Sequence, residues 1–499
     1  MDINIYYSKF AVTTLVIFAM LISNVVKAED KNESVKMDEH VSVTEHDESL
    51  FLPDPSYEEK PYNIDDQLDI YGAKRAVNTT RPLLELGRPI YESGPLQRGS
   101  NVFGRKNPTV NQFSVYGDWR SALAYNDNGN IEKGLFATRL NLDLDYKITA
   151  TERIHAFIRP LDRANQFTRC EFFGDDEDGC SLEANMNIDA LFFEGDLGAI
   201  SSGFLDDYVS WDLPFAIGLM PLLFQNGVWV EDAFTGAALT LPALNSPSLD
   251  ISNMDITFFA GFDKVTTAGV VDSNNSSEDD INLYGVTTFI EANRGYWELG
   301  YGFVDAQDAL NDQDYHNATI SFTKRYNDIL SNSIRIVGNF GQDSNSTQNA
   351  DGFIVLVENS FITDKPSTFI PYLNLFFGSD RPQSLARDAG GILKNTGVNF
   401  ETDGLTGFPK LDDTANNTWG GAIGLNYLFN LDQQLVVEFA TVQTYGKDRI
   451  INRGDEYALG LRYQKPINEK WIFRFDAMKG FIEEAEDIQG VRFEIRRKF

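Results

Sequence analysis

The feature that most constrains this sequence is an alternation of apolar and polar residues with a period of two, which extends over residues 113–499. In one typical stretch, Leu142 and Leu144 alternate with Asp143 and Asp145. Successive side chains of a β strand point to opposite faces, so this period predicts strands with one apolar and one polar face. A chain that keeps the pattern over such a length is predicted to be all-β.

Eighteen segments carry the pattern. They are predicted at 113–125, 134–147, 152–163, 186–198, 213–224, 233–242, 253–264, 280–292, 296–306, 315–326, 331–341, 351–361, 367–378, 417–429, 433–445, 455–465, 469–481 and 489–499. Their length suits a tilted strand that crosses a bilayer, and an even number of strands is typical of closed bacterial barrels. The predicted fold is therefore a transmembrane antiparallel β-barrel of about 18 strands.

The connections between these segments alternate in length, as expected of a barrel with short periplasmic turns and long outer loops. The longer ones follow odd-numbered strands and are predicted to lie outside the cell, notably 161–185, 264–279 and 379–416. Two connections depart from the rule, 200–212 and 242–253, because they are long for periplasmic turns.

Charge and composition narrow the function. The formal net charge of -32 and the isoelectric point of about 4.4 would repel nucleic-acid phosphates, so no nucleic-acid partner is expected. Aromatic residues reach 13% although mean hydropathy is -0.28, which fits strands that expose alternate residues to lipid and carry aromatic rings at the interfaces. A soluble β-sandwich, propeller or β-helix also alternates, but these folds rarely need eighteen long strands in one run.

The N-terminal part predicts export. Residues 1–28 combine Lys9, an apolar run and a small residue, Ala28, which is typical of a secretory signal peptide. An anchoring helix is the alternative. Residues 29–60 are predicted to be an acidic disordered tail, 61–112 an irregular periplasmic or plug segment, and 113–499 the barrel.

The predicted location is the outer membrane of a Gram-negative cell, because the chain is exported and shows no further run of apolar residues long enough for a membrane helix. Outer-membrane lipid and lipopolysaccharide are the expected surroundings. The last strand ends in Phe499, which resembles the terminal signal read by the barrel assembly machinery, a predicted partner. Arg497 stands in that strand where an apolar residue is usual.

Two cysteines, Cys170 and Cys180, bracket an acidic stretch of the first long loop. In an oxidising envelope they are predicted to form a disulfide that closes a small loop. Two thiolates alone provide too few ligands for a metal site.

The polar faces of the strands carry the candidate pore-lining residues, which are Arg120, Arg139, Arg159, Arg335, Arg462, Arg474 and Arg492. Barrel closure brings the last strand beside the first, so all but Arg335 are expected to form one basic arc across neighbouring strands. One hypothesis is that the arc selects anions, since guanidinium groups match carboxylates and phosphates. The other is that these arginines pair with inward carboxylates such as Asp143 and Asp476 and brace the wall.

The outer loops are acidic, with 175–178, 278–280 and 483–487 as the densest stretches. They are predicted to be solvated or to share divalent cations with lipopolysaccharide, and no EF-hand spacing is present. No cofactor and no metal site are expected otherwise.

Enzyme motifs are weak. Of the four histidines, His155 and His316 fall in the predicted barrel. The sequence shows no cluster of a nucleophilic serine with either of them. Ser201–Leu205 does not follow the G-x-S-x-G pattern of a nucleophile elbow. The chain is therefore expected not to be an enzyme. A membrane-embedded hydrolase and a structural barrel plugged by 61–112 remain as alternatives.

The strand count, the inward arginines and the run Leu213–Phe224 followed by Gly227–Ala237 resemble the alginate-export type of outer-membrane porin. The resemblance implies a monomeric eighteen-stranded barrel with an arginine-rich lumen through which an anionic polysaccharide leaves the cell. Gly218 and Leu219 stand where that family would carry a Gly–Arg pair. The sequence thus predicts a passive channel for an anionic oligosaccharide or polysaccharide such as alginate, with a general small-solute porin as the alternative.

Overall fold

The computed structural model describes residues 82–87, 101–104, 111–163, 166–174, 179–271, 281–307, 310, 312–342, 349–402, 404–429, 432–446 and 453–499. The predicted signal peptide and acidic tail lie outside these residues. Among the described residues, no helix has the length and apolar character needed to cross a membrane.

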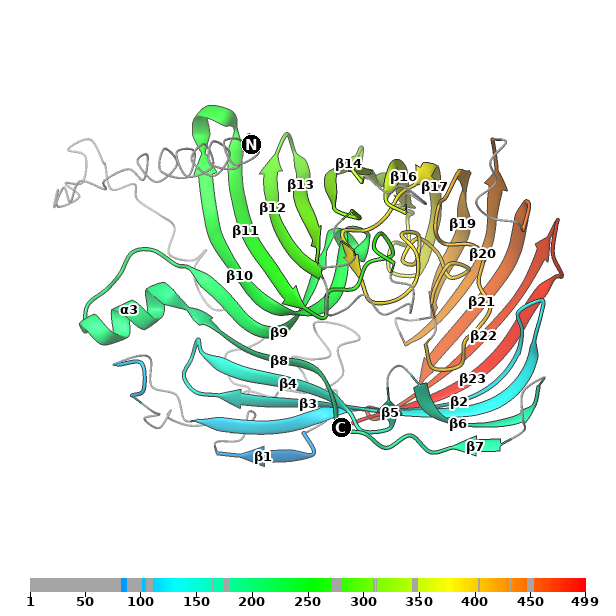
Figure 1. Cartoon of the computed structure of the whole chain (residues 1–499), viewed down its shortest axis with the longest axis horizontal. Coiled ribbons are helices and arrows are strands. Elements are labelled where there is room, and N and C mark those ends of the chain that lie inside the picture. Colours follow the sequence, from blue (N-terminus) through cyan, green and yellow to red (C-terminus); the bar gives the residue numbers. More distant parts are fainter. Residues whose placement is uncertain are drawn as a thin grey trace, which may run out of the picture. The chain divides into compact units, whose positions relative to one another are not determined.

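Eighteen antiparallel strands close into one barrel (Figure 1). They are β2 (Gln112–Asp127), β3 (Glu132–Lys147), β4 (Arg153–Arg159), β8 (Asn187–Asp196), β9 (Pro214–Phe224), β10 (Val230–Ser246), β11 (Ile251–Asp263), β12 (Ile281–Ala292), β13 (Gly295–Ala306), β14 (Tyr315–Tyr326), β15 (Leu330–Phe340), β16 (Asp351–Phe361), β17 (Phe369–Arg381), β19 (Thr418–Phe429), β20 (Gln433–Thr444), β21 (Glu456–Pro466), β22 (Trp471–Ile482) and β23 (Ile488–Lys498). Each predicted strand corresponds to one of these, so the predicted fold class is confirmed.

The barrel closes between its first and last strands. β2 pairs with β23 from Asp118↔Lys498 to Asp127↔Gln489, and the backbones of Gly117 and Phe499 exchange two hydrogen bonds of 2.9 and 3.1 Å. β1 (Leu84–Leu86) pairs with the part of β2 that extends beyond this seam. Residues 84–86 of the predicted irregular segment are therefore a rim strand.

The outer face of the wall is apolar. Large hydrophobic side chains are exposed at alternate positions around the whole barrel, among them Trp119, Leu123, Phe136, Ile217, Phe262, Tyr284, Tyr301, Ile320, Ile334, Phe353, Phe377, Ile423, Phe439, Leu459, Phe481 and Phe493. Such a belt is stable against lipid and not against water. Arg497, the exception in the last strand, lies over the Trp471 ring with its guanidinium carbon 5.7 Å from the ring centre.

The two connections with unexpected lengths have separate explanations. Pro242 lacks an N–H donor, and a bulge forms where Ala243 takes a positive φ, after which β10 and β11 continue to a tight turn at 247–250. The predicted long connection 242–253 is therefore mostly strand. The other one contains helix α3 (Leu197–Leu205), which begins where the Asp196 side chain accepts a hydrogen bond from the Ala199 N–H.

A charge on the outer face should destabilise the barrel in proportion to its depth. Ile423→Arg, at the middle of β19, is expected to cost about 2–4 kcal/mol, and Phe429→Arg, at the end of the same face, about 0–1 kcal/mol. Reversible unfolding in lipid vesicles measures both. Equal costs at the two positions would contradict a membrane-spanning wall.

Candidate pore-lining site

The first element of the lumen is the tip of the β9–β10 hairpin. β8 pairs with β9 only from Asp196↔Pro214 to Leu191↔Leu219, and β10 pairs with β11 only from Thr235↔Asp263 onward. Residues 220–234, here called the inturned tip, therefore leave the wall. The tip is held inside by Trp229, which is fully buried, packs on Phe259 and donates a 2.8 Å hydrogen bond to Asn317 on β14.

The second element is residues 382–402 and 404–417, here called the inner segment, which Figure 1 shows in yellow within the ring of strands. The short strand β18 (Ala386–Arg387) pairs in parallel with β10 at Val230 and Glu231. Arg387 binds Glu231 at 3.1 Å, and Lys394 binds the same carboxylate at 2.9 Å. The inturned tip and the inner segment are thus joined by backbone pairing and by ion pairs.

The inner segment also contacts the wall opposite the tip. Glu438 of β20 accepts hydrogen bonds from the backbone N–H groups of Val398 and Asn399, at 3.0 and 2.9 Å. The Phe400 ring is buried and meets Phe376 of β17 edge to face. The prediction that 379–416 is a long outer loop is therefore only partly right, because most of it lies in the lumen.

Six of the predicted arginines occupy six neighbouring strands, β4, β3, β2, β23, β22 and β21. Arg120 lies directly opposite Arg139 in the β2–β3 register, and Asp476 of β22 lies between Arg462 and Arg492 on its two sides. The residues expected to form one arc are thus adjacent on the inner wall. Arg335 lies apart from them on β15.

Asp476 is the centre of the densest charge cluster. Its carboxylate accepts hydrogen bonds from Arg462 at 2.8 Å, from Arg474 at 2.7 Å and from Arg492 at 2.8 Å. Glu401 of the inner segment, which is attached to the neighbouring β20, forms ion pairs with Arg462 and Arg474. Three guanidinium groups are therefore concentrated around Asp476 and Glu401, with Glu494 of β23 directly opposite Arg474.

The remaining arginines of the arc differ in their partners. Arg120 forms a two-point contact with Glu494 at 2.9 and 2.8 Å, and Arg159 contacts Asp189 and Asp162. These pairs match the bracing hypothesis.

Arg139 behaves differently. It donates to the Asn141 amide at 2.7 Å and lies over the Phe167 ring, with 5.4 Å to the ring centre. Within the described part of the chain it forms no ion pair with a carboxylate. Its close contacts are thus an amide and an aromatic ring, while the charges of Asp118 and Asp162 act on it from a greater distance.

Two of the predicted pore-lining arginines are covered. Arg335 is 1% exposed, because Gln225 of the inturned tip accepts its Nε–H at 3.1 Å while Glu358 binds it at 2.9 Å. Arg492 is also 1% exposed and lies under the Phe408 ring of the inner segment. Neither side chain reaches the open lumen, because the inturned tip covers Arg335 and the inner segment covers Arg492. The strand pattern of the sequence does not predict where these two segments fold.

A cavity of about 840 Å³ lies where the inturned tip leaves the wall. Strands β4 and β8, the inturned tip and the inner segment all contribute to its lining, through Arg159, Asp189, Leu223, Glu231 and Lys394 among others. Both ionic and apolar side chains line it, which suits a solute that has a charged group and an apolar body. Arg159 is the member of the arginine arc that reaches this cavity.

Sequence reasoning missed Glu401, Lys394 and Phe408, which shape the lumen from the inner segment. Their segment shows neither the period of two of a strand nor the period of 3.6 of a helix. No local signal distinguishes an outer loop from a loop folded inward. Asp189 could have been predicted from the sequence. It falls near the start of the predicted strand 186–198, and Arg159 lies near the end of the preceding predicted strand, which pairs with it.

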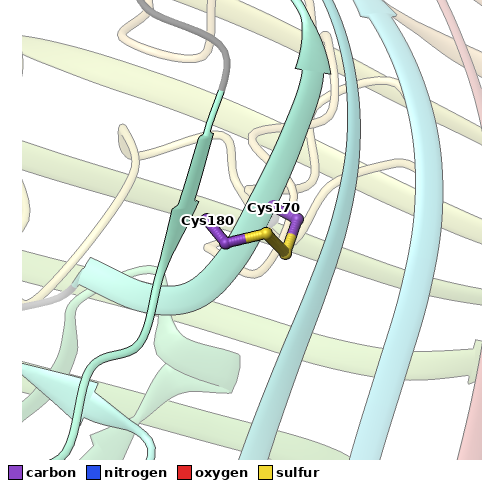
Figure 2. The surroundings of a disulfide bond; sticks show 2 residues. All are labelled: Cys170 and Cys180. Atoms are coloured by element: carbon purple, nitrogen blue, oxygen red, sulfur yellow. A yellow bond between two sulfur atoms is a disulfide. The ribbon is translucent and has the colours of Figure 1, made fainter.

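Cys170 and Cys180 form a disulfide between β6 (Gln166–Phe173) and β7 (Gly179–Ser181), as Figure 2 shows. β6 pairs with β3 beyond the end of β4, so the disulfide stabilises an extension of the wall. His155 contacts Asp143 and Asp145, and His316 lies among Tyr301, Phe303 and Phe340. The described residues hold no group of three acidic, His or Cys side chains arranged for a metal ion.

Solved structures share this architecture. Acinetobacter baumannii OccAB4 aligns with a TM-score of 0.51 at 10% sequence identity, over 80% of this chain and 100% of that one. Pseudomonas aeruginosa OpdQ aligns with a TM-score of 0.50 at 12% identity, over 78% and 98%, and Pseudomonas aeruginosa OpdL with 0.49 at 14%, over 78% and 98%. At such identities the likeness shows the fold alone.

No family model and no curated protein match the sequence. The resemblance to alginate-export porins thus gains support only for its eighteen-stranded barrel. The closed wall and its continuous apolar belt are those of an outer-membrane β-barrel, which confirms the predicted location.

The attachment of the inner segment should depend on pH through Asp412. Burial and the nearby charges of Glu456 and Asp413 raise the pKa of Asp412 to about 7, while the Asp412 N–H donates to Glu456 at 2.8 Å. A carboxyl whose folded pKa is raised takes up a proton on folding, so it weakens the folded segment progressively as the pH rises from about 4 to about 7.

Hydrogen exchange measures this effect. After correction for intrinsic rates, amides of residues 404–417 should be less protected at pH 8 than at pH 5. Asp412→Asn should remove most of the difference. An unchanged pH dependence in this variant would show that another group controls the segment.

Proposed function

We propose that this protein is a passive outer-membrane channel for small solutes, with anionic ones favoured. The observation that carries the proposal is the arginine arc, which concentrates guanidinium groups on one inner wall and faces two chain segments folded into the lumen. A ring or wall of fixed positive charge raises the local concentration of anions and lowers that of cations.

The occupied lumen favours small solutes over a polymer. A barrel of this strand number encloses an aqueous channel when its interior is empty. Here Trp229 fixes the inturned tip to the wall of β14, and Glu438 fixes the inner segment to β20. A polysaccharide would need both segments to move together, whereas a small anion needs only the space between them. The polysaccharide hypothesis is therefore not part of this proposal.

The lining of the cavity next to Arg159 indicates the chemical class of such a solute. Its lining brings charged groups and apolar side chains such as Leu219 and Leu223 together. A carboxylate with a short apolar body satisfies both, because the charge contacts a guanidinium or ammonium group while the body covers apolar surface.

Ion selectivity in planar bilayers tests the role of the arc. Replacing Arg462 and Arg474 together by glutamine should lower the chloride-to-potassium permeability ratio about two- to fivefold, the factor given by an ion energy change of about 0.4–1 kcal/mol. Glu401→Gln should raise the ratio. Arg497→Gln, on the outer face of β23 over the Trp471 ring, is the matched control and should leave it unchanged.

Two outcomes would contradict the proposal. A reversal potential that does not move in the arginine variant would show that the arc only braces the wall. A folded protein that inserts but carries no current, or that hydrolyses ester or glycoside substrates, would favour the structural barrel or the hydrolase instead.

A further inference from the structure

Helix α3 and the residues after it form an apolar surface at the periplasmic end of the barrel that the channel does not use. Phe204 is 64% exposed, Leu205 69% and Tyr208 84%, and Trp211 is also exposed. Figure 1 shows the helix projecting sideways from the end of β8. An exposed cluster of this kind marks a contact surface, because it would be unfavourable in water.

The apolar surface continues onto the lipid-facing wall. Phe193 on β8 and Phe215 on β9 are outward-facing neighbours with ring centres 5.6 Å apart. Phe103 packs on Phe193 at 6.1 Å and on Phe204 at 6.4 Å. An unbroken series of rings therefore leads from the membrane belt to the helix.

The backbone of α3 fits this position, because two glycines allow other chain segments to approach it closely. A Cβ on Gly198 would lie 1.9 Å from the backbone oxygen of Trp211, and a Cβ on Gly104 would lie 1.9 Å from that of Gly203. These close approaches hold the neighbouring chain against the helix. Phe204, Leu205 and Tyr208 remain largely exposed beside these contacts.

We propose that α3 and residues 206–211 lie in the interface of the inner leaflet of the outer membrane and anchor the barrel rim there. Trp and Tyr are the residues that membrane interfaces favour, since each has an apolar ring and a polar group, and Trp211 and Tyr208 provide both. The neighbouring charges, Asp206 and Asp207, are acidic, so attraction to anionic lipid contributes nothing. The anchoring comes from apolar area and should be insensitive to salt.

The anchor does not depend on the proposed channel function, because it lies on the outer surface of the barrel. It can therefore be tested without measuring any current. The chain contains only the two cysteines that form the disulfide, so a third cysteine can be labelled selectively. A bimane fluorophore is attached to Phe204→Cys, to Asp207→Cys as the matched polar control, and to Ile217→Cys as the lipid-facing control. The labelled proteins are placed in vesicles of phosphatidylethanolamine and phosphatidylglycerol.

Lipids with a nitroxide near the headgroup end of the acyl chain should quench the label at 204 nearly as strongly as that at 217, and at least severalfold more than that at 207. Aqueous iodide should quench 207 most, and the result at 204 should hold from low to high salt. Strong iodide quenching at 204 would place the helix in water and overturn the proposal. Protection of 204 from both quenchers would overturn it in favour of a protein partner or a second copy.

Discussion

The structure depends on one constraint, which is that no backbone N–H or C=O group can remain unpaired against lipid. An antiparallel sheet meets it only by closing on itself, and the pairing of β2 with β23 provides that closure. The exchange of hydrogen bonds between Gly117 and Phe499 extends the seam to the final residue. Once the wall is closed, side chains alternate along every strand, with apolar groups toward lipid and polar groups toward the lumen.

Closure at eighteen strands creates a second requirement, because the interior is too wide for wall side chains to fill. The inturned tip and the inner segment occupy part of this space, and buried contacts such as Trp229 with Asn317 hold them. Their charges interlock with the arginine arc through Glu401, and with each other through the ion pair of Lys394 with Glu231. The ion pairs show these guanidinium groups stabilising the wall, and under the proposed function the same groups set the charge that a solute meets, so bracing and anion selection are compatible roles.

Strand positions were predictable because lipid on one side and polar surroundings on the other impose a period of two on every wall strand. The disulfide partners were likewise readable from a sequence with only two cysteines. The burial of Arg335 and Arg492 could not be predicted. Each is covered by a segment that shows no hydrophobic period and is held by contacts distant in sequence. The bulge at Ala243 and helix α3 were missed for a related reason, since a proline and a capping aspartate are local signals that do not determine the conformation of the residues after them.

The central claim is that the two faces of each wall strand meet different solvents. A cysteine scan through residues 139–146 of β3 in lipid vesicles tests it most directly, with one water-soluble and one lipid-soluble thiol reagent applied to each variant. Positions 139, 141, 143 and 145 should react with the water-soluble reagent, and positions 140, 142, 144 and 146 only with the lipid-soluble one. Equal reactivity on both faces, or a period near 3.6, would contradict the barrel described here.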